Sequence, residues 1–261
     1  MQNKPRILLL DIETAPNLTY YWGLHQELHT MDMFVTQWYI LCFCAKWLDA
    51  KDVIKCALPD FKTQYKKNKE NDRFILEVLW KLLDEADIVV THNGVAFDLK
   101  KIYARFAIHG MKPPSSFKTV DTLLSARKHF DFTSNKLGDL GKILGLGQKV
   151  DTGGFKLWRE CMLGNPSAWS RMIVYCKYDV ILMEKVYLRL RPYMQCHPNL
   201  SLYIDCNDMM CPNCSSKNLQ MNGFAYTSQA KYQRVVCKDC GTNARLKKNL
   251  FTKDKIKLVN Y

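Results

Sequence analysis

The chain has 261 residues, of which 48% are apolar, so it can bury a sizeable core without disulfide bonds. Its formal net charge of +13 favours a polyanionic partner such as nucleic acid over an acidic small substrate. The N-terminal apolar run is too short for a signal peptide or a membrane span, and eleven cysteines without such a leader favour a reducing compartment. We therefore expect a cytoplasmic protein, from a bacterial or phage-infected cell.

The apolar pattern predicts strands that come first and then alternate with helices. Residues 6–11 form a short continuous apolar run, typical of a strand buried on both faces. Further strands are predicted at residues 39–49, 52–57, 88–91 and 117–120. Helical spacing covers residues 71–86, 96–109, 135–144 and 167–191, and Asp121 is placed to cap one more helix. This order indicates an α/β domain with a mixed central β-sheet flanked by helices.

The composition changes near residue 195. Residues 207–261 contain ten Lys or Arg against three acids, so this last fifth of the chain carries a net charge of +7. We place the boundary within residues 192–210, which predicts a large domain at residues 1–195 and a small module at residues 206–261.

Acidic residues follow two of the predicted strands and lie on the last helix. Asp11 and Glu13 are two residues apart at the end of the first strand, so their side chains share one face. Asp98 ends the segment THNGVAFD, in the first turn of a helix. Tyr175 and Asp179 are four residues apart on a helix and also share a face. Taken singly, each has an ordinary explanation, such as a solvated strand end or a favourable charge at a helix N-terminus.

Together, D-x-E on the first strand, N-x-x-x-F-D after a later strand and Y-x-x-x-D on a late helix resemble the DEDD (DnaQ-like) superfamily of 3′→5′ exonucleases. The tyrosine makes the chain similar to the proofreading domains of family B DNA polymerases. Residues 135–145, followed by Lys149 and Gly153, look like the segment that these domains carry before their third motif. The resemblance covers roughly residues 6–190. It implies a ribonuclease-H-like fold and an activity that releases nucleoside monophosphates.

The resemblance also implies an active site with two Mg²⁺ or Mn²⁺ ions. The four carboxylates that would hold these ions are Asp11, Glu13, Asp98 and Asp179. Converging carboxylates raise one another's pKa values, and a pair of hard cations offsets their repulsion. Two such ions can activate an attacking water and stabilise the leaving 3′ oxygen, and Tyr175 would orient or help deprotonate that water. The residues implied to contact substrate are Thr14, Asn93 and Phe97.

Residues near these motifs have structural as well as functional interpretations. Asp121 is predicted to be a helix N-cap, with a supporting role at the site as the alternative. Tyr20, Tyr21 and Trp22 follow the first motif and could stack on terminal bases, although packing against the sheet is the favoured interpretation. Among the histidines, His92 is expected to approach the site.

Four cysteines form two C-x-x-C pairs with 22 residues between them, which predicts one structural Zn²⁺. These ligands are Cys211, Cys214, Cys237 and Cys240. The segment between them contains Asn222-Gly223, a hairpin dipeptide, so the module resembles a zinc ribbon. The other seven cysteines are expected to be buried or neutral thiols, with Cys206 as an alternative zinc ligand.

Basic residues of this module interleave with Tyr226 and Tyr232, which suggests a surface that contacts phosphates. The basic residues are Lys231, Arg234, Lys238, Arg245, Lys247 and Lys248. A ribbon that docks on another protein, such as a replication or recombination protein, is the alternative.

We therefore predict a 3′→5′ exonuclease that hydrolyses the phosphodiester bonds of single-stranded DNA, with a ribbon that grips or recruits the substrate. An RNA-trimming exonuclease of the same superfamily is one alternative, because no residue reports on the 2′ hydroxyl. A non-catalytic adaptor that only binds nucleic acid is another, although binding alone would not need the complete acidic set. Glycine-rich phosphate loops are absent from the sequence, which counts against an ATPase or kinase.

Overall fold

The computed structural model describes residues 4–23 and 28–251. The chain divides into two compact units, a larger one at Arg6–Tyr187 and a smaller one that contains Leu188–Tyr261 together with Met1–Pro5. The predicted domain limits at residues 195 and 206 stay a prediction. None of the helices in the described residues is long and apolar enough to cross a membrane.

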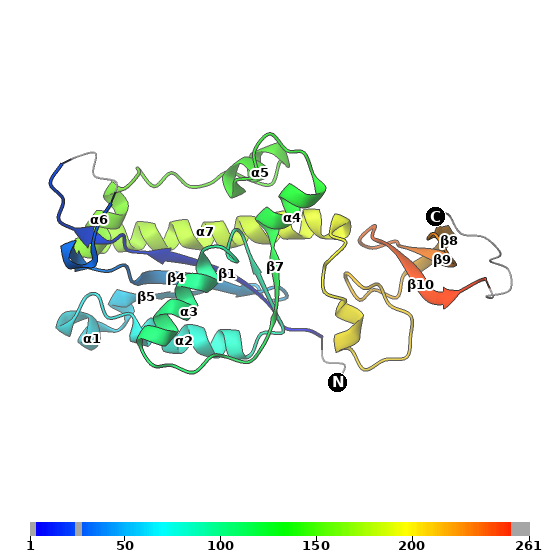
Figure 1. Ribbon diagram of the computed structural model, residues 1–261, viewed down its shortest axis with the longest axis horizontal. Helices are drawn as coiled ribbons and strands as arrows, with labels where there is room; N and C mark the ends of the chain where they lie inside the picture. The colour runs from blue at the N-terminus through cyan, green and yellow to red at the C-terminus, as the bar shows by residue number, and fades with distance from the viewer. Residues whose placement is uncertain (1–3, 24–27, 252–261) are drawn as a thin grey trace. The chain divides into compact units, whose positions relative to one another are not determined.

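The larger unit is built on a five-stranded mixed sheet with the strand order β5-β4-β1-β6-β7 (Figure 1). Its strands are β1 (Ile7–Thr14), β4 (Ile40–Trp47), β5 (Ile54–Ala57), β6 (Ile88–Thr91) and β7 (Lys118–Asp121). β1 is antiparallel to β4 and parallel to β6, while β5 is antiparallel to β4 and β7 is parallel to β6. The predicted mixed sheet of an α/β fold is confirmed.

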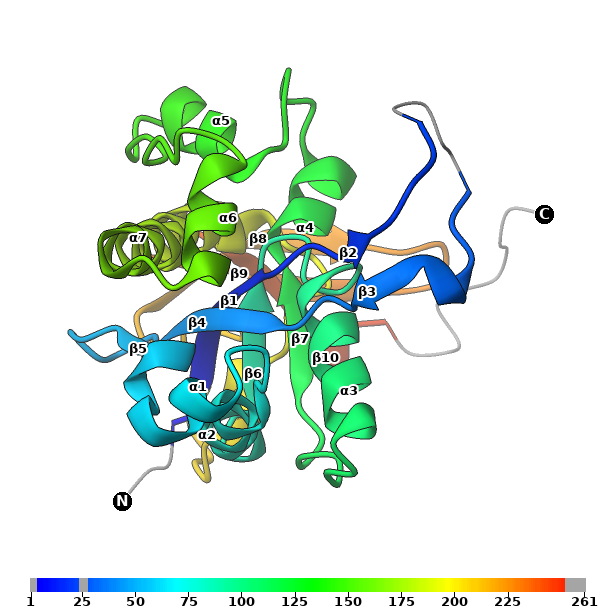
Figure 2. The ribbon, with the colours of Figure 1, turned by 90° about the vertical axis from the view of Figure 1, so that its left-hand side faces the viewer.

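Helices cover both faces of this sheet. In Figure 2, α2 (Arg73–Asp84) and α3 (Asp98–Ile108) lie on one side, and α7 (Pro166–Leu190) lies on the other. The shorter helices are α1 (Lys62–Lys67), α4 (Thr122–His129), α5 (Leu137–Ile143) and α6 (Lys156–Leu163). The 3₁₀ turns are η1 (Met31–Met33), η2 (Leu58–Asp60), η3 (Arg191–Tyr193) and η4 (Leu200–Tyr203).

β1 extends further than its apolar run predicts. Its residues from Ile7 to Leu10 are buried, as expected for a central strand. The strand continues to Thr14 because Asp11 pairs with Cys44, and Glu13 with Cys42, on neighbouring β4. The ladder therefore carries both carboxylates on a rigid, hydrogen-bonded backbone.

The sequence pattern did not predict two short helices of the larger unit. α6 buries only Leu157 and Cys161, four residues apart, and α1 has no buried residue. Such short segments show too few apolar positions for a helical period to stand out in the sequence. Their conformation depends on the elements on which they pack.

β2 (Leu18–Thr19) and β3 (Phe34–Thr36) form a separate two-stranded sheet after β1. Tyr20, Tyr21 and Trp22 follow β2 and are 74%, 57% and 97% exposed. The favoured prediction that they pack against the central sheet is therefore wrong. The chain leaves that sheet after β1, so these aromatic side chains do not reach its apolar faces.

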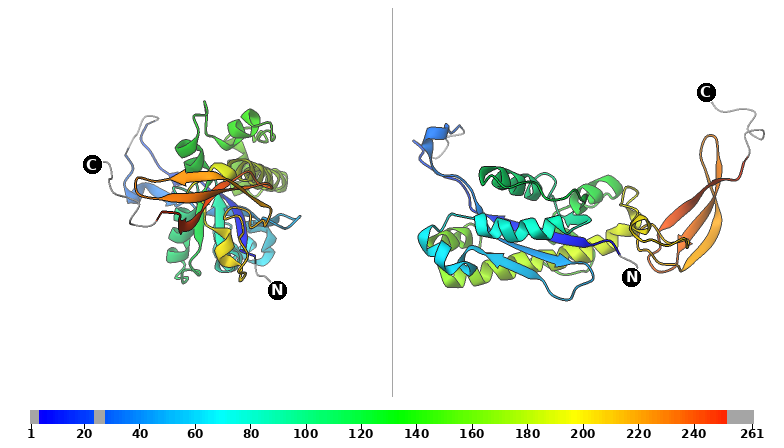
Figure 3. Two further views of the ribbon diagram at one scale, coloured as in Figure 1. Left: turned by 90° about the vertical axis from the view of Figure 1, so that its right-hand side faces the viewer. Right: turned by 90° about the horizontal axis from the view of Figure 1, so that it is seen from below.

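The smaller unit contains an antiparallel sheet with the order β10-β9-β8, drawn in orange and red in Figure 3. Its strands are β8 (Leu219–Tyr226), β9 (Lys231–Cys237) and β10 (Asn243–Asn249). Asn222-Gly223 does not form the hairpin turn that the dipeptide predicts. It lies at an irregularity inside β8, where Gly223 has a φ of +65°, and the chain reverses at residues 227–230.

A buried ionic network joins three elements of the larger unit. Asp72 is fully buried and accepts a hydrogen bond from the Ile40 N–H at the start of β4. From α3, Arg105 donates to the same carboxylate through Nε at 2.7 Å and Nη2 at 2.6 Å, and His109 Nε2 lies 2.7 Å away. The network therefore fastens α3, which begins at Asp98, to the start of β4.

We expect Asp72→Ala to destabilise the protein by about 3–5 kcal/mol, because it leaves the Arg105 charge buried without its partner. Urea unfolding measures this change in free energy. The control is Glu77→Ala, which breaks the exposed Arg73–Glu77 pair on α2 and should cost no more than about 0.5 kcal/mol. Equal costs for the two variants would contradict the assigned role of the network.

Candidate active site

Three acidic side chains from β1 and α7 meet at one point. Asp11 and Glu13 lie on the same face of β1, and Asp179 approaches from α7. Each of the three offers a carboxylate oxygen, and these oxygens all lie within 4.8 Å of one another. Cys176, one turn before Asp179, helps to hold the two elements together, since its thiol lies 3.6 Å from the Asp11 carbonyl oxygen.

Asp98 lies beside these three carboxylates at the start of α3. Its Oδ1 accepts a hydrogen bond of 3.1 Å from the N–H of Ile12, the residue between Asp11 and Glu13. Asp98 is outside the group whose oxygens lie within 4.8 Å, but its negative charge raises the pKa of Asp11. We call these four residues the carboxylate cluster: Asp11, Glu13, Asp98 and Asp179.

Ionisation of the carboxylate cluster is unfavourable when no cation is bound. Burial, followed by the charges of Asp98, Glu13 and Asp179, raises the pKa of Asp11 well above its usual range. Burial likewise raises the pKa of Glu13 to about 8 and that of Asp98 to about 7. At neutral pH the cluster therefore retains protons that a bound cation would displace.

Lys149 supplies a positive charge to the carboxylate cluster. Its Nζ lies 2.7 Å from Asp179 Oδ2 and donates a hydrogen bond of 2.6 Å to the Tyr175 hydroxyl. Its charge also opposes the raised pKa values of Asp11 and Glu13. No spacing rule connects residue 149 with residue 179, so the sequence motifs alone did not assign it this position.

Tyr175 lies next to Asp179 on the inner face of α7, as their spacing predicts, and its side chain is buried. Burial, reinforced by the charge of Asp179, raises the pKa of the Tyr175 phenol above its usual range. The phenol is therefore neutral at physiological pH, able to donate one hydrogen bond and to accept another.

An aromatic pocket of about 590 Å³ opens beside Glu13 and Thr14. Its aromatic walls are Trp38, Phe97, Phe155 and Trp158. The Lys101 ammonium lies 3.7 Å from the ring centroid of Trp38, which adds a positive charge to this apolar surface. Of the four aromatic residues, only Phe97 was identified from the sequence, through its place in the second motif.

A second, basic pocket of about 740 Å³ reaches the cluster at Asp11 and Asp179. His92 and Asn93 line it, so His92 approaches the site as predicted. Burial lowers the pKa of His92 to about 4, which keeps its ring neutral. The basic side chains that line this pocket are Arg127, Lys136, Lys142 and Lys149.

The turn that carries Asn93 is shaped by backbone contacts. Asn93 has a φ of +71°, and a Cβ on Gly94 would lie 2.4 Å from Thr91 Cβ, so the chain passes too close for a larger residue. Asp121 accepts hydrogen bonds from the N–H groups of Asn93 and Val95. The same carboxylate caps α4, so the predicted N-cap is confirmed and also supports this turn.

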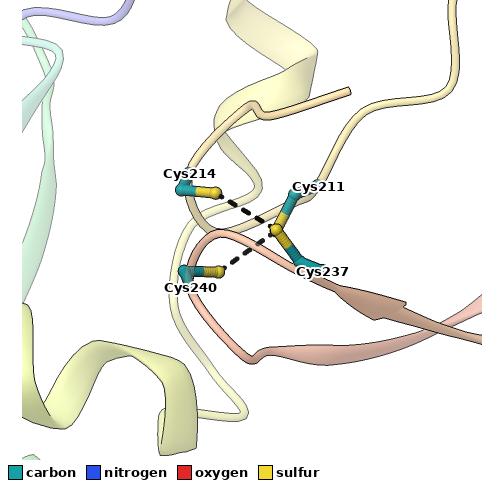
Figure 4. A group of neighbouring side chains, drawn as sticks. All are labelled: Cys211, Cys214, Cys237 and Cys240. Atoms are coloured by element: carbon teal, nitrogen blue, oxygen red, sulfur yellow. Dashed lines mark hydrogen bonds between the residues drawn. The ribbon is translucent and has the colours of Figure 1, made fainter. Parts of the chain in front are cut away.

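Four cysteine thiols of the smaller unit converge from two turns (Figure 4). Cys211 Sγ lies 3.6 Å from Cys240 Sγ, and Cys214 Sγ lies 3.6 Å from Cys237 Sγ. A tetrahedral zinc ion with Zn–S bonds of about 2.3 Å would place its sulfurs about 3.8 Å apart. The cluster therefore fits zinc, and Cys206, the alternative ligand, lies outside it.

The carboxylate cluster has the donors that a hard cation requires. All its donor atoms are carboxylate oxygens, which suit Mg²⁺ or Mn²⁺ better than zinc. Within the described residues, the buried Asp179 Oδ1 has no hydrogen-bond partner, so it is free to act as a ligand. These residues therefore fit divalent cations.

Comparison with curated protein sequences finds no match. Among solved structures, the family B DNA polymerase from the hyperthermophilic archaeon Pyrobaculum calidifontis matches with a TM-score of 0.52 and 13% identity. The match covers 74% of this chain but only 26% of the polymerase chain, and at this identity it shows a shared fold.

A family model described as the RNase_H superfamily matches residues 39–191, more than half of the chain. The matched residues include Asp98, Tyr175 and Asp179, whereas Asp11 and Glu13 lie before them on β1, which pairs with β4 inside the match. The fold and the family model thus agree with the ribonuclease-H-like architecture expected from the motifs. The chain belongs to the RNase H superfamily.

Proposed function

We propose that this protein is a metal-dependent 3′→5′ exonuclease of the DEDD superfamily, in its tyrosine subgroup. Membership of the RNase H superfamily supports a nuclease-type hydrolase in general. The observation that carries the finer proposal is the convergence of Asp11, Glu13 and Asp179 within 4.8 Å, with Asp98 beside them. The carboxylates would hold two Mg²⁺ or Mn²⁺ ions.

When bound, such ions would lower the pKa of an attacking water and stabilise the leaving 3′ oxygen. The protein's own contribution is to orient that water. Because the buried Tyr175 phenol keeps its proton at neutral pH, we infer that it directs the water by hydrogen bonding and is not the main base. Lys149 fixes the phenol from one side through its 2.6 Å hydrogen bond.

The two pockets suit chemically different parts of the substrate. The aromatic pocket suits the terminal nucleoside, because every base offers a flat face for stacking on Phe97 and its neighbours. Thr14 lines this pocket beside Glu13, where it would contact the terminal sugar. The basic pocket, which includes Asn93, suits the negatively charged phosphates.

DNA is the proposed substrate class, because the motif pattern is nearest to that of polymerase proofreading domains. RNA is the alternative, since neither pocket identifies a group that would select for or against a 2′ hydroxyl. A non-catalytic adaptor is disfavoured, because binding alone would not require buried carboxylates with raised pKa values.

The four cysteines would hold one structural Zn²⁺ in a zinc ribbon that binds nucleic acid. Strands β8, β9 and β10 contain five basic residues and no acidic one. The Lys231 ammonium lies 3.8 Å from the Phe224 ring centroid, and the Arg245 guanidinium lies 3.7 Å from that of Tyr232. Phe224 is exposed and Tyr232 is half-buried, and such rings beside cations suit stacked bases and phosphates, so we favour nucleic acid over a replication or recombination protein as the partner.

Three further basic residues of the tail, Lys253, Lys255 and Lys257, lie outside the described residues. None of the eleven cysteines, all of which lie within the described residues, forms a disulfide bond, which suits a reducing compartment such as the cytoplasm. We keep residues 1–195 and 206–261 as the proposed limits of the exonuclease domain and the ribbon.

The test of activity is shortening of 5′-labelled single-stranded DNA and RNA in Mg²⁺ or Mn²⁺. We expect progressive loss of nucleotides from the 3′ end, and a rate that falls by about 10³-fold in Asp179→Ala because a cation ligand is lost. Tyr175→Phe should lose about 10²-fold while it still binds metal, since only the orienting hydroxyl is removed.

Glu77→Ala, which changes an exposed acid on α2, serves as the control and should keep the wild-type rate. Binding of DNA and RNA without shortening would support the adaptor instead. An unchanged rate in Tyr175→Phe would reject the role assigned to the phenol.

The raised pKa values predict how stability depends on pH. Without divalent cations, Glu13 and Asp98 stay protonated in the folded protein up to pH values of about 8 and 7, so folding is favoured at low pH. This contribution is complete below the ordinary pKa values of 4.5 and 3.8 and is lost progressively as the pH rises to the folded values, so the Tm of the metal-free protein should fall between about pH 4 and pH 8.

Differential scanning fluorimetry of zinc-loaded protein, with and without Mn²⁺, measures this dependence. Mn²⁺ should raise the Tm most at the alkaline end, where the carboxylates are charged. Glu13→Gln removes one titrating group and should flatten the metal-free profile. A Tm independent of both pH and Mn²⁺ would contradict the assignment of the carboxylate cluster as a cation site.

The ribbon is tested by binding of single-stranded DNA to the full chain carrying Asp179→Ala, which blocks hydrolysis. Removal of two phosphate contacts by Lys231→Gln with Arg245→Gln should weaken binding. It should also lower the slope of log K against log salt by about 1.4. The control is Lys217→Gln, because Lys217 is paired with Asp208. Unchanged affinity and slope, with one zinc bound per chain, would favour a protein partner for the ribbon.

A further inference from the structure

Trp158 on α6 contacts two members of the candidate active site at once. Its indole N–H lies within reach of the Glu13 carboxylate, whose pKa it lowers, and both residues line the same pocket. Its ring meets Tyr175 edge-on, with centroids 6.0 Å apart and an interplanar angle of 73°. Trp158 also lines the aromatic pocket together with Glu13, so it stands between the site for a base and the carboxylate cluster.

The surrounding chain holds this indole in place. Leu157 and Cys161 are buried and anchor α6, and Gly164 ends the helix in a left-handed conformation with a φ of +89°. The segment before α6 is tied to α7 by a hydrogen bond of 3.0 Å from Arg171 Nη2 to the Thr152 carbonyl. Trp158 is thus carried on a helix fixed at both ends.

The contacts are suited to orienting a cation ligand. A neutral N–H donor can occupy one lone pair of the Glu13 carboxylate without competing for charge, which leaves the other lone pairs for a cation. The edge-to-face contact restricts rotation of the Tyr175 ring, whose hydroxyl is already held by Lys149. One side chain can therefore set the directions of a ligand and of the orienting phenol.

We propose that Trp158 is a positioning residue, which orients Glu13 and Tyr175 from the wall of the aromatic pocket. The expected effect of Trp158 on catalysis rests on the proposed exonuclease function. Its expected effect on the orientation of Glu13 concerns cation binding and does not depend on that function. The competing interpretation is that Trp158 is only an apolar wall of the pocket.

The variant that separates these interpretations is Trp158→Phe, which keeps an aromatic wall but removes the N–H donor. The matched control is Trp38→Phe, because Trp38 lines the same pocket while its ring contacts Lys101. Mn²⁺ titration of the zinc-loaded full chain, followed by electron paramagnetic resonance, measures cation affinity without any need for hydrolysis.

We expect Trp158→Phe to bind Mn²⁺ about 10–100-fold more weakly than the wild type, as other partners of metal ligands do when removed. Trp38→Phe should keep the wild-type Mn²⁺ affinity. With DNA as substrate, Trp158→Phe should lower kcat more than it raises KM. Unchanged Mn²⁺ affinity in Trp158→Phe, or an equal loss in both variants, would overturn the proposal.

If Trp158→Phe does not fold, the wild-type indole signals provide the test. The chain has six tryptophans, whose indole N–H groups can be followed by ¹⁵N NMR. Glu13→Gln and Mg²⁺ should each shift the same one of these signals, and no such shift would overturn the proposal. If the protein proves not to shorten nucleic acid, these cation measurements still decide the role of Trp158.

Discussion

The repulsion among four partly or fully buried carboxylates is the constraint on which the candidate site depends. Asp98 and Asp179 are only 5% and 2% exposed, so water screens their charges poorly. The fold keeps them together because they lie on elements fastened by other interactions, namely the β1–β4 ladder, the Asp72–Arg105 network and the buried face of α7. Apolar packing and hydrogen bonding elsewhere thus offset an arrangement that is unfavourable without cations.

Lys149 offsets part of this repulsion from within the chain. Its ammonium is tethered to the segment between α5 and α6, and its side chain is 38% exposed, whereas that of Asp179 is 3% exposed. An internal cation that contacts Asp179 and Tyr175 preserves their geometry when divalent ions are absent. Because one lysine cannot neutralise four carboxylates, the cluster still favours additional positive charge.

Local spacing predicted the parts of the site that lie within one element. The two-residue period of β1 joins Asp11 to Glu13, and the helical period of α7 joins Tyr175 to Asp179. The approach of Asp98 to Ile12 spans 86 residues, so only the family resemblance indicated it. Trp158 left no signal in the sequence, because its position depends on how short α6 packs. The aromatic run near residue 21 gave a wrong prediction for a different reason. Its composition is typical of a strand packed in a sheet, but at these residues the chain has already left the central sheet.

The two metal sites proposed for this chain differ in ligand chemistry, which would sort their ions. Thiolates select zinc, whereas carboxylates select Mg²⁺ or Mn²⁺. Cys176 is a thiol beside the carboxylate cluster that could in principle attract zinc, because its Sγ lies only 3.5 Å from Asp11 Oδ2. Burial raises the pKa of the Cys176 thiol well above its usual range, so the sulfur keeps its proton and acts as a weak hydrogen-bond donor. The carboxylate cluster therefore remains an all-oxygen site although a thiol lies against it.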